Sequence, residues 1–223
     1  MKFIYNPCGI SETLSENEVL VLSIENPRIY NEIVGHIYEQ VHGGISPIIV
    51  SEGEKSLNLS KTAILVDSPF RIDANERSVI TKLYHELKEN AQSILYQKMI
   101  TLNGQIVSFL NEVVQSVPYI IDSDSELNLE GLFKLYSLKL AVSDATILER
   151  LVDYIKIMAR LCSYKLFFLQ NIKLFFTPEE LGMLYEMASY EKINLVLLEG
   201  HFLSHLTGEK NIVIDNDACM IPM

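Results

Sequence analysis

Cysteine is scarce in this sequence of 223 residues, and tryptophan is absent. The three cysteines, Cys8, Cys162 and Cys219, lie far apart, and the sequence contains no CxxC pair. Such spacing indicates neither a disulfide framework nor a tetrahedral zinc site. A reduced, cytoplasmic protein is the simplest interpretation.

Long hydrophobic runs are missing as well. The most apolar segment, residues 161–176, is interrupted by Lys165, Gln170, Asn171 and Lys173. The sequence therefore has no uninterrupted apolar stretch of the roughly 18 residues that a membrane span needs. The first residues turn polar too early for a signal peptide.

Basic residues are few, with 18 lysines and arginines against 29 acidic residues and a net charge of −11. This balance argues against binding of polyanions by the whole surface. Eleven of the basic residues lie between positions 61 and 160, so any contact with nucleic acid would come from this middle part. Mixed charge on long surface helices, which favours solubility, explains the same distribution equally well.

Proline is absent from residues 76–117, and Gly104 is the one glycine there. Apolar residues recur in this segment at intervals of three and four, which predicts one continuous helix of roughly 60 Å. We expect residues 71–142 to form a helical extension inserted into an α/β body made of residues 1–70 and 143–223. An inserted arm of this kind is typical of a molecule that reaches a partner.

The flanking segments predict strands alternating with helices. A capping box at Thr177–Glu180 starts a helix that runs to about Tyr190, and Asn26 with Pro27 starts another. Residues 127–138 are expected to form a shorter helix. Ser143 is expected to cap the next helix, which spans residues 144–161. We expect a mostly parallel sheet with flanking helices. The predicted strands are Phe3–Tyr5, Glu18–Ile24, Ile48–Val50, Ala63–Val66, Lys165–Leu169, Asn194–Leu198 and Asn211–Ile214.

Motifs for enzyme chemistry are missing. A phosphate loop would lie at residues 23–28, between a strand and a helix, but this segment has no glycine and carries Glu25 where phosphate would bind. His201 and His205 are four residues apart but lack the glutamate of the zinc-protease motif. We therefore expect no catalytic residues and no nucleotide, and predict a protein that is not an enzyme.

Four carboxylates lie within nine residues, at Asp122, Asp124, Glu126 and Glu130. Carboxylates in a turn are ligands that calcium prefers, although the glycine of an EF-hand loop is missing. Acidic residues at Asp124 and Glu126 would also favour the start of the next helix, by capping its free N–H groups and through its dipole, and spacing alone favours this second explanation.

Taken together, these segments resemble the small CRISPR-associated protein of type II-A systems, which is needed for spacer acquisition and binds the ends of double-stranded DNA. The resemblance covers about Glu18 to Ile221 at low identity but in consistent order. The segments that carry it are EVLVLSIEN, IYNEIVGHIYEQ, AILVD, VITKLYHEL, LFKLYSLKL, TILERLVDYIK, KLFFLQN, FTPEEL and LVLLEG.

The resemblance implies a body like a degenerate phosphate-loop ATPase, with a helical extension and a ring-shaped homotetramer around duplex DNA. It implies calcium at Asp122, Asp124, Glu126 and Glu130 as a structural ion. It also implies phosphate contacts from Lys134 and Lys139, and partnership with the CRISPR integrase complex and an RNA-guided effector nuclease. Apolar residues beside the main helical stripe, at Leu95, Ile100, Val107, Leu110 and Val114, agree with such assembly.

The chain departs from the family pattern at two basic positions. Glu32 stands where relatives carry a lysine, and a basic run before the KLFFL strand is reduced to Lys165. Fewer cations predict weaker DNA binding. Two alternatives remain: a degenerate nucleotide-dependent, ATPase-like enzyme, and a scaffold that bridges proteins without binding DNA.

Overall fold

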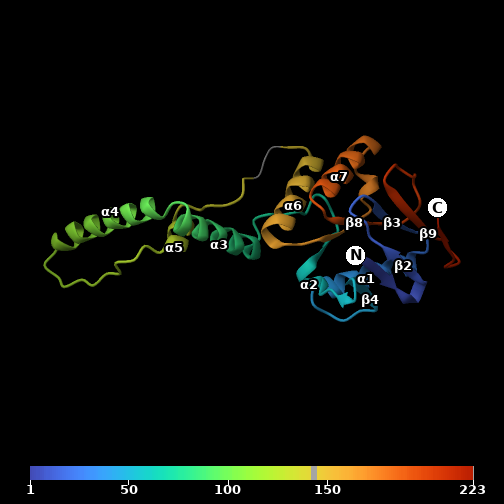
Figure 1. Cartoon of the computed structure of the whole chain (residues 1–223), viewed down its shortest axis with the longest axis horizontal. Coiled ribbons are helices and arrows are strands. Elements are labelled where there is room, and N and C mark those ends of the chain that lie inside the picture. The colour runs from blue at the N-terminus through green and yellow to red at the C-terminus, as the bar shows by residue number, and fades with distance from the viewer. Residues whose placement is uncertain (142–144, 223) are drawn as a thin grey trace. The chain divides into compact units, whose positions relative to one another are not determined.

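The computed structural model describes residues 1–141 and 145–222, shown in Figure 1. The chain divides into two compact units, an α/β body of Met1–Ala74 with Val142–Met223 and a helical unit of Asn75–Ala141. Within the described residues, none of the helices combines the length and apolar character that crossing a membrane requires.

A six-stranded sheet forms the centre of the body, and five of its strands are parallel. The antiparallel strand β10 lies at one edge and was not predicted. Both β3 and β8 are buried along their whole length, as the continuous apolar runs predicted for a sheet covered on two faces. The strands are, in spatial order, β10 (Met220–Pro222), β9 (Glu209–Ile214), β3 (Val19–Ile24), β8 (Asn194–Glu199), β7 (Leu166–Gln170) and β6 (Ala63–Val66).

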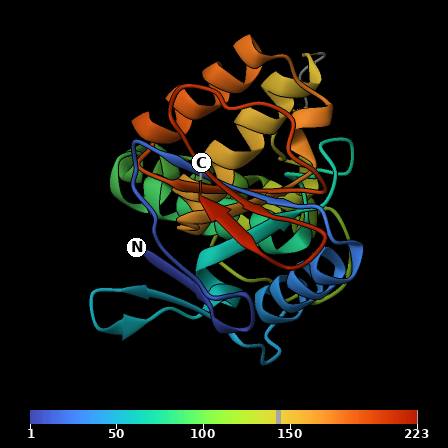
Figure 2. The same ribbon diagram turned by 90° about the vertical axis from the view of Figure 1, so that its right-hand side faces the viewer.

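Helices cover both faces of this sheet, which confirms the predicted α/β class (Figure 2). α6 (Ile147–Cys162) and α7 (Pro178–Tyr190) lie on one face, and α1 (Pro27–Val41) lies on the other. Ile33 and Ile37 of α1 are fully buried against strand residues such as Leu22 and Val196. The short α2 (Leu59–Thr62) precedes β6.

A second, four-stranded antiparallel sheet packs into the core on the α1 side. Its strands are, in order, β2 (Ile10–Thr13), β1 (Lys2–Tyr5), β4 (Ile48–Glu52) and β5 (Lys55–Ser56). Phe3 of β1 contacts Phe168 of β7 with ring centroids 6.0 Å apart, so the two sheets share one hydrophobic core. The sequence predicted β1 and β4 but not the short β2 and β5, which are largely polar.

Two local predictions about helix starts have different outcomes. The Thr177 capping box is present, with the Glu180 N–H donating to Thr177 Oγ1 and the Thr177 N–H donating to Glu180. The predicted cap Ser143 lies outside the described residues. The following helix begins at Ile147, where Thr146 and Glu149 form a second capping box.

The helical unit corrects the prediction of one continuous helix. α3 (Arg77–Ser93) and α4 (Tyr96–Gln115) are separate, and α5 (Leu129–Leu135) follows after an irregular segment. At the break, the Leu95 N–H donates to the carbonyl of Asn90, five residues earlier, so the regular hydrogen-bond ladder is lost. No proline or glycine marks the break, which is why the sequence pattern concealed it.

Candidate nucleic-acid interface

The two predicted phosphate-binding lysines lie at the C-terminal end of α5. Lys134 is in its last turn and Lys139 follows a tight turn, and both side chains are exposed. In the turn, the Leu138 N–H donates to the Phe133 carbonyl and the Ser137 N–H donates to the Lys134 carbonyl, both at 3.0 Å. This is a Schellman motif, with Ser137 in the left-handed conformation at φ 50°. We call residues 134–139 the α5 tip.

Contacts to α3 and to Asn75, two residues before α3 begins, hold the α5 tip in place. The Tyr84 hydroxyl donates to the Leu138 carbonyl at 3.0 Å, and the Tyr84 ring meets Phe133 edge-on, with centroids 5.6 Å apart. The Asn75 amide bonds both backbone groups of Leu140, at 3.1 and 2.9 Å. Hydrogen bonds on both sides of Lys139 therefore fix its backbone, a role of Asn75 and Tyr84 that the sequence did not reveal.

The surroundings of the two lysines favour an anion. Residues 131–141 contain no acidic side chain, in a chain that is otherwise rich in carboxylates. Neither Lys134 nor Lys139 forms an ion pair with any residue in the part of the chain that the structure describes. The closest acidic residue in sequence, Glu130, is 3.5 Å from Lys88 Nζ and is partly neutralised by it. Two exposed cations without carboxylate partners are available for phosphate groups.

The four acidic residues predicted as calcium ligands lie in and after the irregular segment that joins α4 to α5. Asp122 Oδ1 accepts a hydrogen bond from the Ser123 N–H at 3.0 Å, and Glu130 pairs with Lys88. The helix start is capped by Asn128, whose side chain accepts from the Gly131 N–H. The alternative explanation, that Asp124 and Glu126 cap this helix, is therefore wrong, whereas Glu130 does lie in the first turn.

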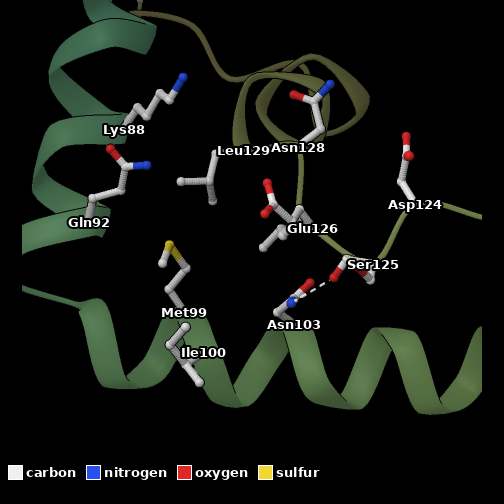
Figure 3. Close-up of a pocket in the computed structure, with 11 residues that line it drawn as sticks. Lys88, Gln92, Met99, Ile100, Asn103, Asp124, Ser125, Glu126, Asn128 and Leu129 are labelled. Atoms are coloured by element: carbon white, nitrogen blue, oxygen red, sulfur yellow. Dashed lines mark hydrogen bonds between the residues drawn. The ribbon is translucent and has the colours of Figure 1, made fainter.

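A hollow of about 740 Å³ separates this segment from α3 and α4 (Figure 3). Lys88, Met99, Asn103 and Glu126 are among its lining residues, and the Asn103 amide donates to the Ser125 carbonyl at 3.0 Å. The Asp124 carboxylate is directed away from that of Glu126 in Figure 3.

Calcium does not fit these residues as they are arranged here. Among residues 1–141 and 145–222, no three His, Cys, Asp or Glu side chains lie close enough to hold one metal ion. Binding at Asp122, Asp124, Glu126 and Glu130 would require the segment to rearrange, and the calcium site stays a prediction.

In the body, the junction of β3 and α1 has the position of a phosphate loop but not its chemistry. The Asn26 side chain accepts from the N–H groups of Arg28 and Ile29, at 3.0 and 3.3 Å. Its own amide donates to the Asn216 carbonyl, which fixes the cap. The helix N–H groups that would bind phosphate are thus already occupied, and Glu25 adds a negative charge beside them.

A buried polar network on the α7 side of the sheet was missed by the sequence analysis. The Lys173 ammonium lies 2.8 Å from Glu209 Oε1 and also donates to the Ser204 carbonyl. Tyr185 and Asn211 donate to the same Glu209 carboxylate, at 2.7 and 3.2 Å. Burial opposes the charge on Glu209, but these hydrogen bonds outweigh it and hold its pKa below the usual range.

Glu199 lies at the other end of the network and has the opposite shift. Burial raises its pKa to about 7, although the Lys173 N–H donates to it at 3.2 Å. His205, which pairs with Asn211 Nδ2 at 2.7 Å, belongs to this network. Among the described residues, no group of three His, Cys, Asp or Glu side chains that could hold a metal ion includes His201 or His205. The network ties the segment after β7 to the start of β9 and has the character of a structural element.

Comparison with known proteins identifies the family. No curated protein matches this chain. One similar solved structure is a protein described as an ABC transporter (ATP-binding protein) from Pyrococcus furiosus, with 13% identity over 91% of this chain and 88% of that one, at a TM-score of 0.40. A likeness at this level does not extend to a ligand or an activity. The sequence profile described as CRISPR-associated protein (Cas_Csn2) matches residues 40–218, most of the chain, and the chain therefore belongs to this CRISPR-associated family.

Proposed function

We propose that this protein is a non-enzymatic, sequence-independent double-stranded DNA-binding protein that takes part in CRISPR adaptation, the acquisition of new spacers in antiviral defence. The observation that carries the proposal is the α5 tip, where two unpaired lysines lie on a rigid turn free of carboxylates. Contacts from lysines to phosphate groups carry no base information, so binding is independent of sequence.

Assembly into a ring-shaped homotetramer belongs to the same proposal. α4 has no buried residue over its 20 residues, and its exposed side chains include Ile100, Phe109, Leu110 and Val113. A helix with this much exposed apolar surface needs a partner, and a second copy of the chain supplies one in a closed symmetric assembly. Light scattering should give four times the chain mass of 25.4 kDa. A monomer at micromolar concentration would contradict the ring.

DNA ends are the proposed target because a closed ring can receive duplex only by threading. Linear duplex should bind, and a closed circle of equal length and sequence should not. Replacing both lysines, Lys134→Ala with Lys139→Ala, should weaken binding equally across sequences while leaving the tetramer intact. Lys61→Ala, at an exposed lysine of the body, is the matched control. If circular and linear duplex bind equally well, the proposal that the ring threads onto DNA ends is overturned.

Two alternatives give different results in these experiments. A degenerate ATPase-like enzyme would bind a nucleotide, and the capped β3–α1 junction argues against that. A protein-bridging scaffold would bind neither form of DNA at low salt, while still binding the proposed partners, the CRISPR integrase complex and the RNA-guided effector nuclease. A nucleotide titration and a gel shift separate the three.

A further inference from the structure

The α5 tip exposes apolar side chains as well as lysines. Leu135 is 78% exposed and Tyr136 is 72% exposed, and both lie between Lys134 and Lys139. The single backbone N–H of Tyr136 is used inside the turn, where it donates to the carbonyls of Leu132 and Lys134. Its phenol ring makes none of the ring contacts found among the described residues. An aromatic ring is therefore presented to the outside on a fixed backbone.

Rigidity of the tip makes this exposure informative. The Schellman turn, the Tyr84 hydroxyl and the Asn75 amide hold the backbone on both sides of the ring. A side chain carried on such a turn loses little backbone freedom when it binds, so the cost of forming a contact is small.

The local charge indicates what the contact is. Flanking lysines with no acidic residue from 131 to 141 favour a negatively charged partner over a basic or neutral one, and under the proposed function that partner is DNA. An aromatic ring between two cations is the arrangement by which proteins stack on bases while holding phosphates, without sequence preference.

Inside a duplex, neighbouring pairs cover both faces of every base. Unless it forces a base step apart, an aromatic side chain can stack only on a terminal pair or on an unpaired nucleotide beside it. We propose that Tyr136 stacks on the first unpaired base at a duplex end, while Lys134 and Lys139 contact the adjoining phosphates. This inference rests on the proposed DNA binding and adds that the protein itself distinguishes a duplex with an overhang from a blunt one.

The test compares one duplex of about 30 base pairs with blunt ends and the same duplex with an overhang of about four nucleotides. Wild type should bind the overhang form at least about fivefold more tightly, the lower part of the range for one stacked base. Tyr136→Ala should bind both forms alike, whereas Tyr136→Phe should keep the preference because it keeps the ring. Tyr119→Ala is the matched control, since Tyr119 is also 72% exposed in the same unit but has no lysine beside it.

A fluorescent base analogue, 2-aminopurine, at the first unpaired position gives a second readout. Stacking on Tyr136 should quench it in wild type and in Tyr136→Phe, and Tyr136→Ala should not quench it. An overhang preference that survives in Tyr136→Ala overturns the inference, as does an equal loss in Tyr119→Ala. A change in assembly mass in Tyr136→Ala also overturns it and assigns the ring to a subunit contact.

Failure of this inference differs from failure of the proposed function. If wild type binds blunt and overhang duplex equally, the stacking role is wrong and DNA binding stands. If wild type binds neither, the proposed function fails as well.

Discussion

Glu199 is a carboxyl group that the fold keeps close to neutral. It is 1% exposed, and burial raises its pKa to about 7, above the value of about 4.3 in an unfolded chain. Between these two values the folded protein holds a proton that the unfolded chain releases. The contribution of Glu199 to the free energy of unfolding is therefore fully present below about pH 4.3 and is lost as the pH rises to about 7.

Glu199→Gln should remove this loss, because glutamine is neutral at every pH. At pH 8 we expect the variant to exceed wild type in free energy of unfolding by up to roughly 4 kcal/mol, and near pH 4.5 the difference should vanish. Urea denaturation at the two pH values measures it. Glu209→Gln is the control, and it should destabilise at pH 8 because Lys173 then loses its charged partner. A less stable Glu199→Gln at pH 8 would show that the charged form is the one the fold needs.

Ser137 adopts a conformation that glycine adopts at lower cost. Its φ of 50° lies in the left-handed region at the C′ position of the Schellman turn. Ser137→Gly should raise the free energy of unfolding by about 0.5–1 kcal/mol, because it removes the strain of a side chain in this region. DNA binding should stay unchanged. Ser123→Gly, in the irregular segment, should give no gain, and an equal gain there would contradict the reason given.

At the scale of elements, much of the body could be predicted from its sequence. The strands β3, β7 and β8 are formed mainly by continuous apolar runs, and β9 ends in the shorter run Ile212–Ile214. Thr177-Pro178 with Glu180 is a local signal for a helix start. These predictions succeed because an apolar run of this length corresponds to a buried strand, and a capping box corresponds to the start of a helix. The short strands β2, β5 and β10 pair with β1, β4 and β9, which are close in sequence, but they are too short or too polar to show the apolar pattern that predicts a strand.

The helical unit was harder to predict for a physical reason. The break at Ile94–Leu95 uses residues that are common in helices, so the apolar stripe runs through it unchanged. The candidate site shows the same contrast. The resemblance named Lys134 and Lys139 as candidates, and their phosphate contacts stay a prediction. Asn75 and Tyr84, which hold the turn between them, lie 54 to 65 residues away from the groups they bind, and no sequence pattern indicated them.

The segment between α4 and α5 gives a prediction about calcium. Its carboxylates repel one another and do not converge in this structure, so an ion that gathers them would order the segment. Added millimolar calcium should raise the melting temperature, a chelator should lower it, and Asp124→Ala with Glu126→Ala should abolish the response. Glu16→Ala with Glu54→Ala, at exposed carboxylates of the body, should keep it. A melting temperature that ignores calcium and chelator would leave Glu130 with its role in the first turn of α5.

For the whole molecule, the net charge of −11 opposes DNA binding, and the position of the cations has to overcome it. Salt acts on this balance in two ways: it screens the repulsion from the body, and it reduces the gain from releasing counterions. The α5 tips of a tetramer would present eight lysines to one duplex, and each phosphate contact adds about one to the salt slope.

We therefore expect the affinity of wild type for linear duplex to fall with salt, and Lys139→Ala to reduce the slope of log affinity against log salt by one to four. In Lys134→Ala with Lys139→Ala the slope should approach zero, because only the screened repulsion from the acidic body remains. Fluorescence anisotropy between about 50 and 200 mM salt measures these slopes. Lys61→Ala should leave the slope as in wild type. If it lowers the slope as much as Lys139→Ala does, the body contacts DNA and the α5 tip is not the principal phosphate site.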